Sequence, residues 1–123
     1  MRKKFDNSST LVDSIIQGIQ DKKGKEIVRL NLSSLENSVC EYFVICHGES
    51  NTQVEAIANS IEEKVSDKLN QRVWRRSGRE NLQWVLLDYF DVVVHIFQKQ
   101  YREFYRLEDL WADADCQLVE SEF

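Results

Sequence analysis

The chain has no proline and only four glycines among its 123 residues. With no stretch rich in these residues and no internal repeat, the sequence shows no linker and no domain boundary. No apolar run approaches the roughly 20 residues that a membrane-spanning helix needs. The basic opening, residues 1–12, is not followed by an apolar segment, so we expect neither secretion nor a membrane contact. The length and composition therefore predict one domain with a real hydrophobic core.

Cysteine is also scarce, and its spacing does not suit a disulfide framework. Cys40, Cys46 and Cys116 are expected to be free thiols of a cytoplasmic protein. No C-x-x-C or H-E-x-x-H pattern is present, and Cys46 and His47 are strand neighbours that point to opposite faces. The same geometry argues against a Cys–His catalytic pair. We therefore predict no metal, no cofactor and no catalytic residue.

The net charge of -5 is modest and disfavours a general nucleic-acid binder, so no sequence-specific contact with nucleic acid is expected. The charge is unevenly distributed, because residues 72–79 hold four arginines. Everything after Leu107 holds six acidic residues and no lysine or arginine. We interpret residues 113–123 as a solvated acidic tail, or alternatively as a segment that meets a basic partner surface.

Apolar residues at helical spacing predict three amphipathic helices after a disordered leader, residues 1–8. The first helix is expected to stop at Gly24 as a C-terminal cap or turn. The second opens at Ser50, because Ser50 and Gln53 match a capping box. The predicted helices cover residues 9–21, 50–69 and 101–111.

Alternating or continuous apolar runs predict five strands between these helices, at residues 25–32, 41–47, 71–76, 82–88 and 91–97. Residues 41–47 are apolar on both faces, which indicates a central strand. Residues 71–76 suit a short, basic edge strand. The strand–glycine–helix passage over 42–69 is typical of a crossover in a partly parallel sheet. The chain is thus predicted to be a single-domain α/β protein, with a mixed sheet of four to five strands and helices packed on it.

The last two predicted strands are typical of a β-hairpin. A two-residue loop at Tyr89 and Phe90 would pair Leu86 with Val93 and Trp84 with His95. Strand alternation then separates an aliphatic face from a mixed one. The aliphatic face, expected to lie on the core, contains Val85, Leu87, Val92, Val94 and Ile96. The mixed face contains Leu82, Trp84, Leu86, Val93, His95 and Phe97, with Asp88 and Asp91 at its tip.

We interpret the mixed face as half-covered or as a contact surface, because aromatic residues on exposed patches commonly anchor interfaces. Alternatively, a further helix covers it as ordinary core, or it serves only to form a homodimer. An enzyme of nucleotidyltransferase type is a second function to consider, with Asp88, Asp91 and the Gly48–Ser50 turn as its site. One glycine falls far short of a phosphate-binding loop, and the two aspartates are better explained as turn residues.

Several runs of the chain form a recognisable set: Tyr42-Phe-Val-Ile-Cys, Gly48–Ser50, Trp84-Val-Leu-Leu-Asp, Asp91-Val-Val-Val-His-Ile-Phe, Arg102-x-x-Tyr105 and Leu107-Glu-Asp-Leu-Trp111. Together they resemble the ribosomal silencing factor family, also called Iojap-like, over about residues 9–112. The resemblance implies a nucleotidyltransferase-like fold without transferase activity. It also implies binding to the large ribosomal subunit through its ribosomal protein fourteen. Bound there, the factor would block joining of the small subunit and repress translation when nutrients are scarce.

The resemblance further implies that Trp84 belongs to the contact surface and that the free protein is a homodimer. The predicted partner-binding residues are Trp84, Leu86, Asp88, Asp91, His95 and Phe97. The chain departs from the family pattern at Phe90, where the family usually has glycine. Because phenylalanine resists the positive φ of a tight loop, either the corner is wider or Phe90 is strained. Residues 76–79 also replace the usual Glu-Gly and add basic charge.

Overall fold

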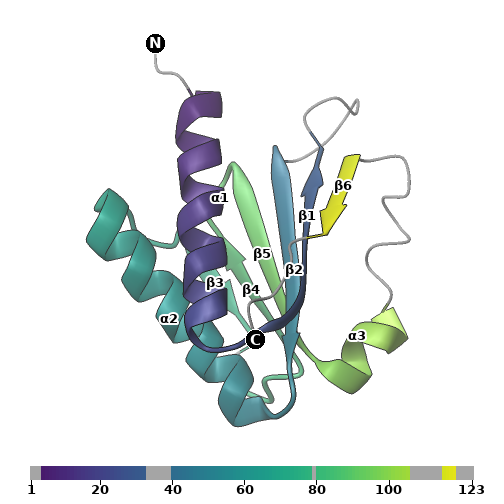
Figure 1. Ribbon diagram of the computed structural model, residues 1–123. Helices are drawn as coiled ribbons and strands as arrows, with labels where there is room; N and C mark the ends of the chain where they lie inside the picture. The colour runs from purple at the N-terminus through teal and green to yellow at the C-terminus, as the bar shows by residue number, and fades with distance from the viewer. Residues whose placement is uncertain (1–3, 33–39, 79, 106–114, 119–123) are drawn as a thin grey trace.

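A computed structural model describes residues 4–32, 40–78, 80–105 and 115–118, which form one six-stranded sheet with helices packed on it (Figure 1). The helices are α1 (Lys4–Asp21), α2 (Asn51–Leu69) and α3 (Lys99–Tyr105). The strands are β1 (Lys25–Asn31), β2 (Tyr42–Gly48), β3 (Arg75–Ser77), β4 (Trp84–Asp88), β5 (Val92–Gln98) and β6 (Asp115–Leu118). Their order in the sheet is β3-β4-β5-β2-β1-β6. The predicted α/β fold with a mixed sheet is confirmed.

The centre of the sheet is the parallel pair β2 and β5, joined in register from Tyr42 opposite Val92 to Gly48 opposite Gln98. The other neighbouring strands pair antiparallel. Residues 43–48 and 92–97 are buried throughout, so both strands are covered on both faces. Parallel strands need a long crossover connection, and α2 lies within it. The predicted central strand and crossover are therefore confirmed.

One face of the sheet is covered by α1 and α2, which lie side by side in Figure 1. Their buried stripes, together with the aliphatic side of β4 and β5, form the first hydrophobic core. The two helices cross closely at Gly18, where an added Cβ would come within 2.9 Å of the Ile61 Cα. At the same crossing the Ser60 hydroxyl donates a hydrogen bond to the Gly18 carbonyl at 2.8 Å.

Hydrogen bonds close the end of α1 and the start of α2, and the sequence predicted only some of them. Ser50 Oγ accepts the Gln53 N–H at 3.1 Å, as the capping box predicts. The Gln53 side chain, however, reaches back to the Glu49 N–H rather than to that of Ser50, at 2.7 Å. At the end of α1 the left-handed residue is Lys23, with φ +62°, and not Gly24. The N–H of Gly24 then bonds to the Ile19 carbonyl at 3.0 Å, which closes a Schellman-type cap.

The hairpin corner differs from the prediction by one residue. Tyr89 N–H bonds to the Val92 carbonyl at 2.9 Å, so the loop residues are Phe90 and Asp91. Phe90 has φ +74°, a region that costs an L-residue roughly 1–2 kcal/mol. Asp88 Oδ1 stabilises this corner by accepting the Phe90 N–H at 2.8 Å. Trp84 is consequently opposite Phe97, and Leu86 is opposite His95.

This correction does not exchange the two faces of the hairpin. Moving the loop by one residue shifts each cross-strand partner by two, and side chains alternate with a period of two. Val85, Leu87 and Val94 still belong to the first core, as predicted. Leu82 is the exception, because it precedes β4, has φ +58° and packs against the first core instead of lying on the mixed face.

The boundaries also differ at both ends of the chain. Helix α1 begins at Lys4, so residues 4–8 are helical instead of belonging to a disordered leader. Within the predicted acidic tail, β6 pairs antiparallel with β1 and raises the strand number to six. Residues 106–111, predicted to continue the last helix, lie outside the described residues. The basic edge strand is confirmed as β3, although it begins later than predicted.

Gly78 provides a test of the edge next to the hairpin. Its φ is +88°, and an added Cβ would lie 2.2 Å from the Trp84 carbonyl oxygen, a backbone atom that cannot move aside. We expect Gly78→Ala to lower the free energy of unfolding by about 2 kcal/mol or more, measured by urea denaturation. Gly48→Ala is the matched control, since the nearest atoms to its Cβ would belong to the flexible Gln53 side chain, at 3.2–3.3 Å. Equal losses in the two variants would contradict the described geometry.

Candidate partner-binding surface on the mixed face

The mixed face extends across the sheet as a second hydrophobic cluster, opposite the face that α1 and α2 cover. Of the described helices only α3 contributes to this side, through Tyr101. The buried members of the cluster are Val28, Leu30, Leu32, Cys40, Phe43, Ile45, Val93 and Phe97. Trp84 and Leu86 on β4 are only partly buried. The half-covered surface predicted for this face is therefore present at β4.

Trp84 is held in one orientation by two side chains of β5. Its indole stacks on Phe97 with ring centroids 4.9 Å apart and planes 27° apart. Its Nε1–H donates a hydrogen bond to His95 Nδ1 at 3.1 Å. An indole nitrogen can only donate, so His95 must accept with Nδ1 and carry its proton on Nε2. The partly exposed ring is thus fixed before any partner arrives.

His95 itself is buried, with 4% of its surface exposed, and it contacts the Phe43 ring edge-to-face at 4.6 Å. Burial lowers the pKa of His95 from 6.5 to about 4, because the interior disfavours the charged imidazolium. Its Nε2 is buried without a hydrogen-bond partner among the described residues. The neutral form therefore supports Trp84 at physiological pH.

The tip of the mixed face carries Asp88 and Asp91, both half-buried. Asp88 caps the corner through the Phe90 N–H, while the Asp91 carbonyl accepts the N–H groups of Glu41 and Tyr42 at 2.8 and 3.2 Å. Both carboxylates lie near the Cys40 thiol. Burial first, and then the charges of Asp88 and Asp91, raise the pKa of that thiol to about 11. The two aspartates thus have structural roles at the turn, as the sequence suggested.

The six predicted contact residues divide into two groups. Trp84, Leu86, Asp88 and Asp91 are partly accessible, so they can meet a partner directly. His95 and Phe97 are buried beneath Trp84 and can act only by positioning it. Strand alternation predicts a shared face but not depth within it, which explains why the sequence grouped all six together.

Arg102 attaches α3 to the strands beneath it and was missed as a structural residue. It is buried, and its Nη1 donates to the Glu26 carbonyl at 2.8 Å and contacts His47 Nδ1 at 3.0 Å. Glu26 presents its carbonyl from a bulge in β1, where it has φ +48°. Burial, and then the charge of Arg102, lower the pKa of His47, so that His47 stays neutral and can accept. In the sequence, Arg102 stood out only as part of the Arg102-x-x-Tyr105 run.

The nucleotidyltransferase alternative requires residues that the fold separates. The Asp91 carbonyl accepts the N–H groups of Glu41 and Tyr42 at the start of β2, whereas the Gly48–Ser50 turn begins at the last residue of β2. A seven-residue strand places these points about 20 Å apart. The turn is also satisfied internally, because the Glu49 N–H bonds to Gln53 and the Gln53 N–H bonds to Ser50. It is a helix cap, and the two aspartates and the turn do not make one site.

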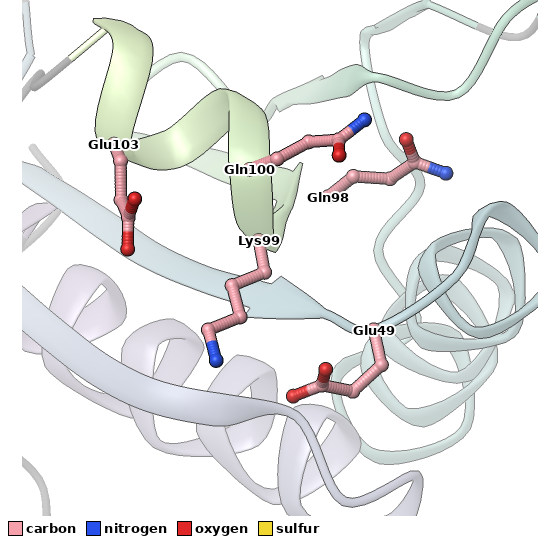
Figure 2. A pocket seen from close by; sticks show the side chains of 5 residues that line it. All are labelled: Glu49, Gln98, Lys99, Gln100 and Glu103. Carbon is pink, nitrogen blue, oxygen red and sulfur yellow. The ribbon is translucent and has the colours of Figure 1, made fainter.

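A surface hollow of about 400 Å³ lies beside this turn, between Glu49 and the start of α3 (Figure 2). It is lined by Glu49, Gln98, Lys99, Gln100 and Glu103. Figure 2 shows Glu49, Lys99 and Glu103 extending to one side of it and the two glutamines to the other. Two carboxylates against one ammonium make a poor phosphate site. The hollow therefore adds no support for nucleotide chemistry.

Other features of the described residues concern the remaining predictions. Cys40 and Cys46 are buried free thiols, and burial raises the pKa of Cys46 to about 12. The side chain of Cys116 lies outside the described part. No group of three or more His, Cys, Asp or Glu side chains that could hold a metal ion is found where side chains are described. No described helix has the length and apolar character needed to cross a membrane.

The α/β fold thus has a preformed and partly exposed apolar face. Comparison with known proteins gives the family. A family model described as ribosomal silencing factor during starvation matches residues 5–123. The chain therefore belongs to the ribosomal silencing factor family, which confirms the resemblance.

Individual relatives agree with this assignment. The ribosomal silencing factor RsfS of Halalkalibacterium halodurans is 39% identical over 108 residues, which cover 88% of this chain and 91% of that protein. The chloroplastic protein Iojap of Zea mays is 38% identical over 73 residues, covering 59% of this chain and 31% of that protein. A crystal structure of a Chromobacterium violaceum protein superposes with a TM-score of 0.80 at 32% identity, covering 93% of this chain and 94% of that one. The two named relatives carry the names of a silencing factor and of Iojap, not of enzymes.

The buried imidazole predicts a pH dependence of stability. The unfolded chain binds the His95 proton below about 6.5 and the folded protein only below about 4. The stability supplied by neutral His95 is therefore present above pH 6.5 and is lost as pH falls toward 4, at about 1.4 kcal/mol per pH unit. His95→Asn retains an acceptor for Trp84 but does not titrate. We expect wild type to lose about 2–3 kcal/mol more than this variant between pH 7 and pH 4.5 in urea denaturation; identical losses would contradict this.

Proposed function

We propose that this protein is a cytoplasmic, non-enzymatic translation repressor that binds the large ribosomal subunit through the mixed face. The supporting observation is the fixed and partly exposed Trp84, which lies beside Leu86 on β4. The face is apolar at its centre and carries Asp88 and Asp91 at its rim. This is the usual anatomy of a protein interface, with aromatic anchors surrounded by polar groups.

The proposed partner on the subunit is its ribosomal protein fourteen. An apolar, aromatic face suits a protein surface better than a phosphate backbone, because its predicted contact residues include no cationic side chain for phosphates. The indole N–H of Trp84 already donates to His95, so the Trp84 side chain offers a partner its apolar ring and no hydrogen-bond donor. Binding would then depend on burying the indole and Leu86, while the rim aspartates would favour basic groups around the contact.

The proposed mechanism is steric. A protein of this size, bound where the small subunit docks, prevents the two subunits from joining and so lowers translation. No chemical step is required, which agrees with the separation of Asp91 from the Gly48–Ser50 turn. The word starvation in the description of the family model agrees with action under nutrient limitation.

Leu86 allows this proposal to be tested with a matched control. Leu86→Ala and Trp84→Ala are expected to reduce co-sedimentation with purified large subunits at least tenfold, because each removes apolar area from the contact. Leu69→Ala truncates another half-buried leucine at the end of α2, and it should bind as wild type does. Circular dichroism verifies that each variant is folded. Undiminished binding by folded Trp84→Ala and Leu86→Ala would refute the proposed surface.

We also propose that the free protein is a homodimer, as its family membership suggests. Sedimentation equilibrium of the purified protein should then give twice the 14.5 kDa mass of one chain. A concentration-independent monomer mass would contradict this part of the proposal.

A further inference from the structure

Two exposed aromatic side chains meet at the β3 edge of the sheet, outside both hydrophobic cores. Trp74 is 52% exposed and Phe90 is 59% exposed, and they are the only large exposed hydrophobic residues in the described part of the chain. Their ring centroids are 4.6 Å apart with planes tilted by 37°. The Arg75 guanidinium lies 4.7 Å from the centroid of the Trp74 ring. We call Arg72, Trp74, Arg75 and Phe90 the basic aromatic edge.

Phe90 occupies a backbone conformation that favours glycine. Its φ of +74° is imposed by the tight corner, and Asp88 Oδ1 holds its N–H in place. An exposed phenylalanine gains little from burial that could offset this strain. Strained backbone conformations cluster at active sites, ligand-binding sites and switch regions. The corner therefore presents the Phe90 ring outward beside Trp74.

Arg72 and Arg75 bring positive charge to this edge, and Asp88, which lies opposite Arg75 on β4, accepts the Phe90 N–H. Arg72 and Arg75 are exposed, and neither makes an ion pair with any residue that the structure describes. Arg76, in contrast, turns to α2, where its Nη1 bonds to Glu62 at 2.7 Å and to Asn59 at 2.9 Å. Two guanidinium groups that make no ion pair among the described residues, one of them against the Trp74 ring, thus accompany two exposed rings in a chain whose net charge is -5.

We propose that the basic aromatic edge binds single-stranded RNA. Sites for single-stranded nucleic acid combine cationic side chains that contact phosphates with aromatic rings on which bases stack, and they need no sequence-specific hydrogen bonds. Arg72 and Arg75 would contact phosphates, while Phe90 and Trp74 would offer stacking surfaces. The positive charge of Arg72 and Arg75 disfavours a basic protein as the partner. An acidic protein could pair with the arginines, but it would give the two exposed rings no specific role.

The placement of this edge links it to the proposed function, on which its biological target rests. Strand β3 pairs with β4, so that Arg75 is opposite Asp88 and Ser77 is opposite Leu86. The mixed face and the basic aromatic edge are therefore adjacent. A ribosomal subunit consists of both protein and RNA, so one particle could occupy both surfaces at once, protein on the mixed face and a single-stranded RNA segment on the edge.

Binding can be measured without ribosomes, by fluorescence anisotropy of a labelled twelve-nucleotide single-stranded RNA. Wild type is expected to bind at low salt, with log K falling against log salt at a slope of about -1.4 for two phosphate contacts. Phe90→Gly suits the corner and should stay folded, but it should bind about tenfold more weakly through lost stacking. Arg75→Gln should bind more weakly and reduce the slope by about 0.7.

Two further variants serve as controls. Lys22→Gln removes an exposed charge from the turn after α1, at the opposite end of the sheet, and should bind RNA as wild type does. Leu86→Ala should also retain RNA binding, although its co-sedimentation with large subunits should be reduced. The two measurements therefore test this inference and the proposed function separately.

The inference is overturned if wild type does not bind the RNA, or if Phe90→Gly and Arg75→Gln bind it as tightly as wild type. Loss of RNA binding in Leu86→Ala would show that the RNA binds to the mixed face, and this result would also overturn the inference. If wild type does not bind the RNA but Phe90→Gly no longer co-sediments with large subunits, the basic aromatic edge contacts a ribosomal protein instead.

Discussion

The parallel pairing of β2 with β5 is the constraint on which the rest of this fold depends. Both strands are apolar on both sides, and such strands must be covered on both faces of the sheet. Their parallel direction also requires a crossover, which brings α2 to one face beside α1. The first core is the direct consequence. The opposite face remains apolar for the same reason, although among the described helices only α3 reaches it.

That second face gives the domain a preformed and partly exposed apolar surface. At its centre, Phe97 and His95 on β5 hold the Trp84 indole of β4. The hydrogen bond satisfies the only polar atom of the indole, so the exposed part of Trp84 behaves as a purely apolar surface. Because His95 is buried and neutral, this arrangement needs no partner to form. A preorganised anchor loses little conformational freedom on binding, which favours affinity.

The β3 edge places two exposed aromatic side chains and two exposed arginines at one corner of the sheet. The corner keeps its two-residue loop despite the phenylalanine, since Asp88 stabilises it and the ring finds Trp74. Neither Trp74 nor Phe90 belongs to either core, so the fold does not depend on their side chains.

Periodicity alone determined most of the architecture: the central strand, the crossover helix, the capped start of α2 and the two faces of the hairpin. These features follow from local spacing, and the faces survived a wrong loop position because alternation has a period of two. The sequence runs also identified the family. Tertiary structure alone decided which residues of the mixed face are accessible, since depth depends on neighbouring strands and on α3. It also decided that Phe90 adopts a positive φ, that Lys23 and not Gly24 caps α1, and that Asp91 and the Gly48–Ser50 turn lie at opposite ends of β2. Each of these depends on contacts between segments far apart in the chain, which no local pattern encodes.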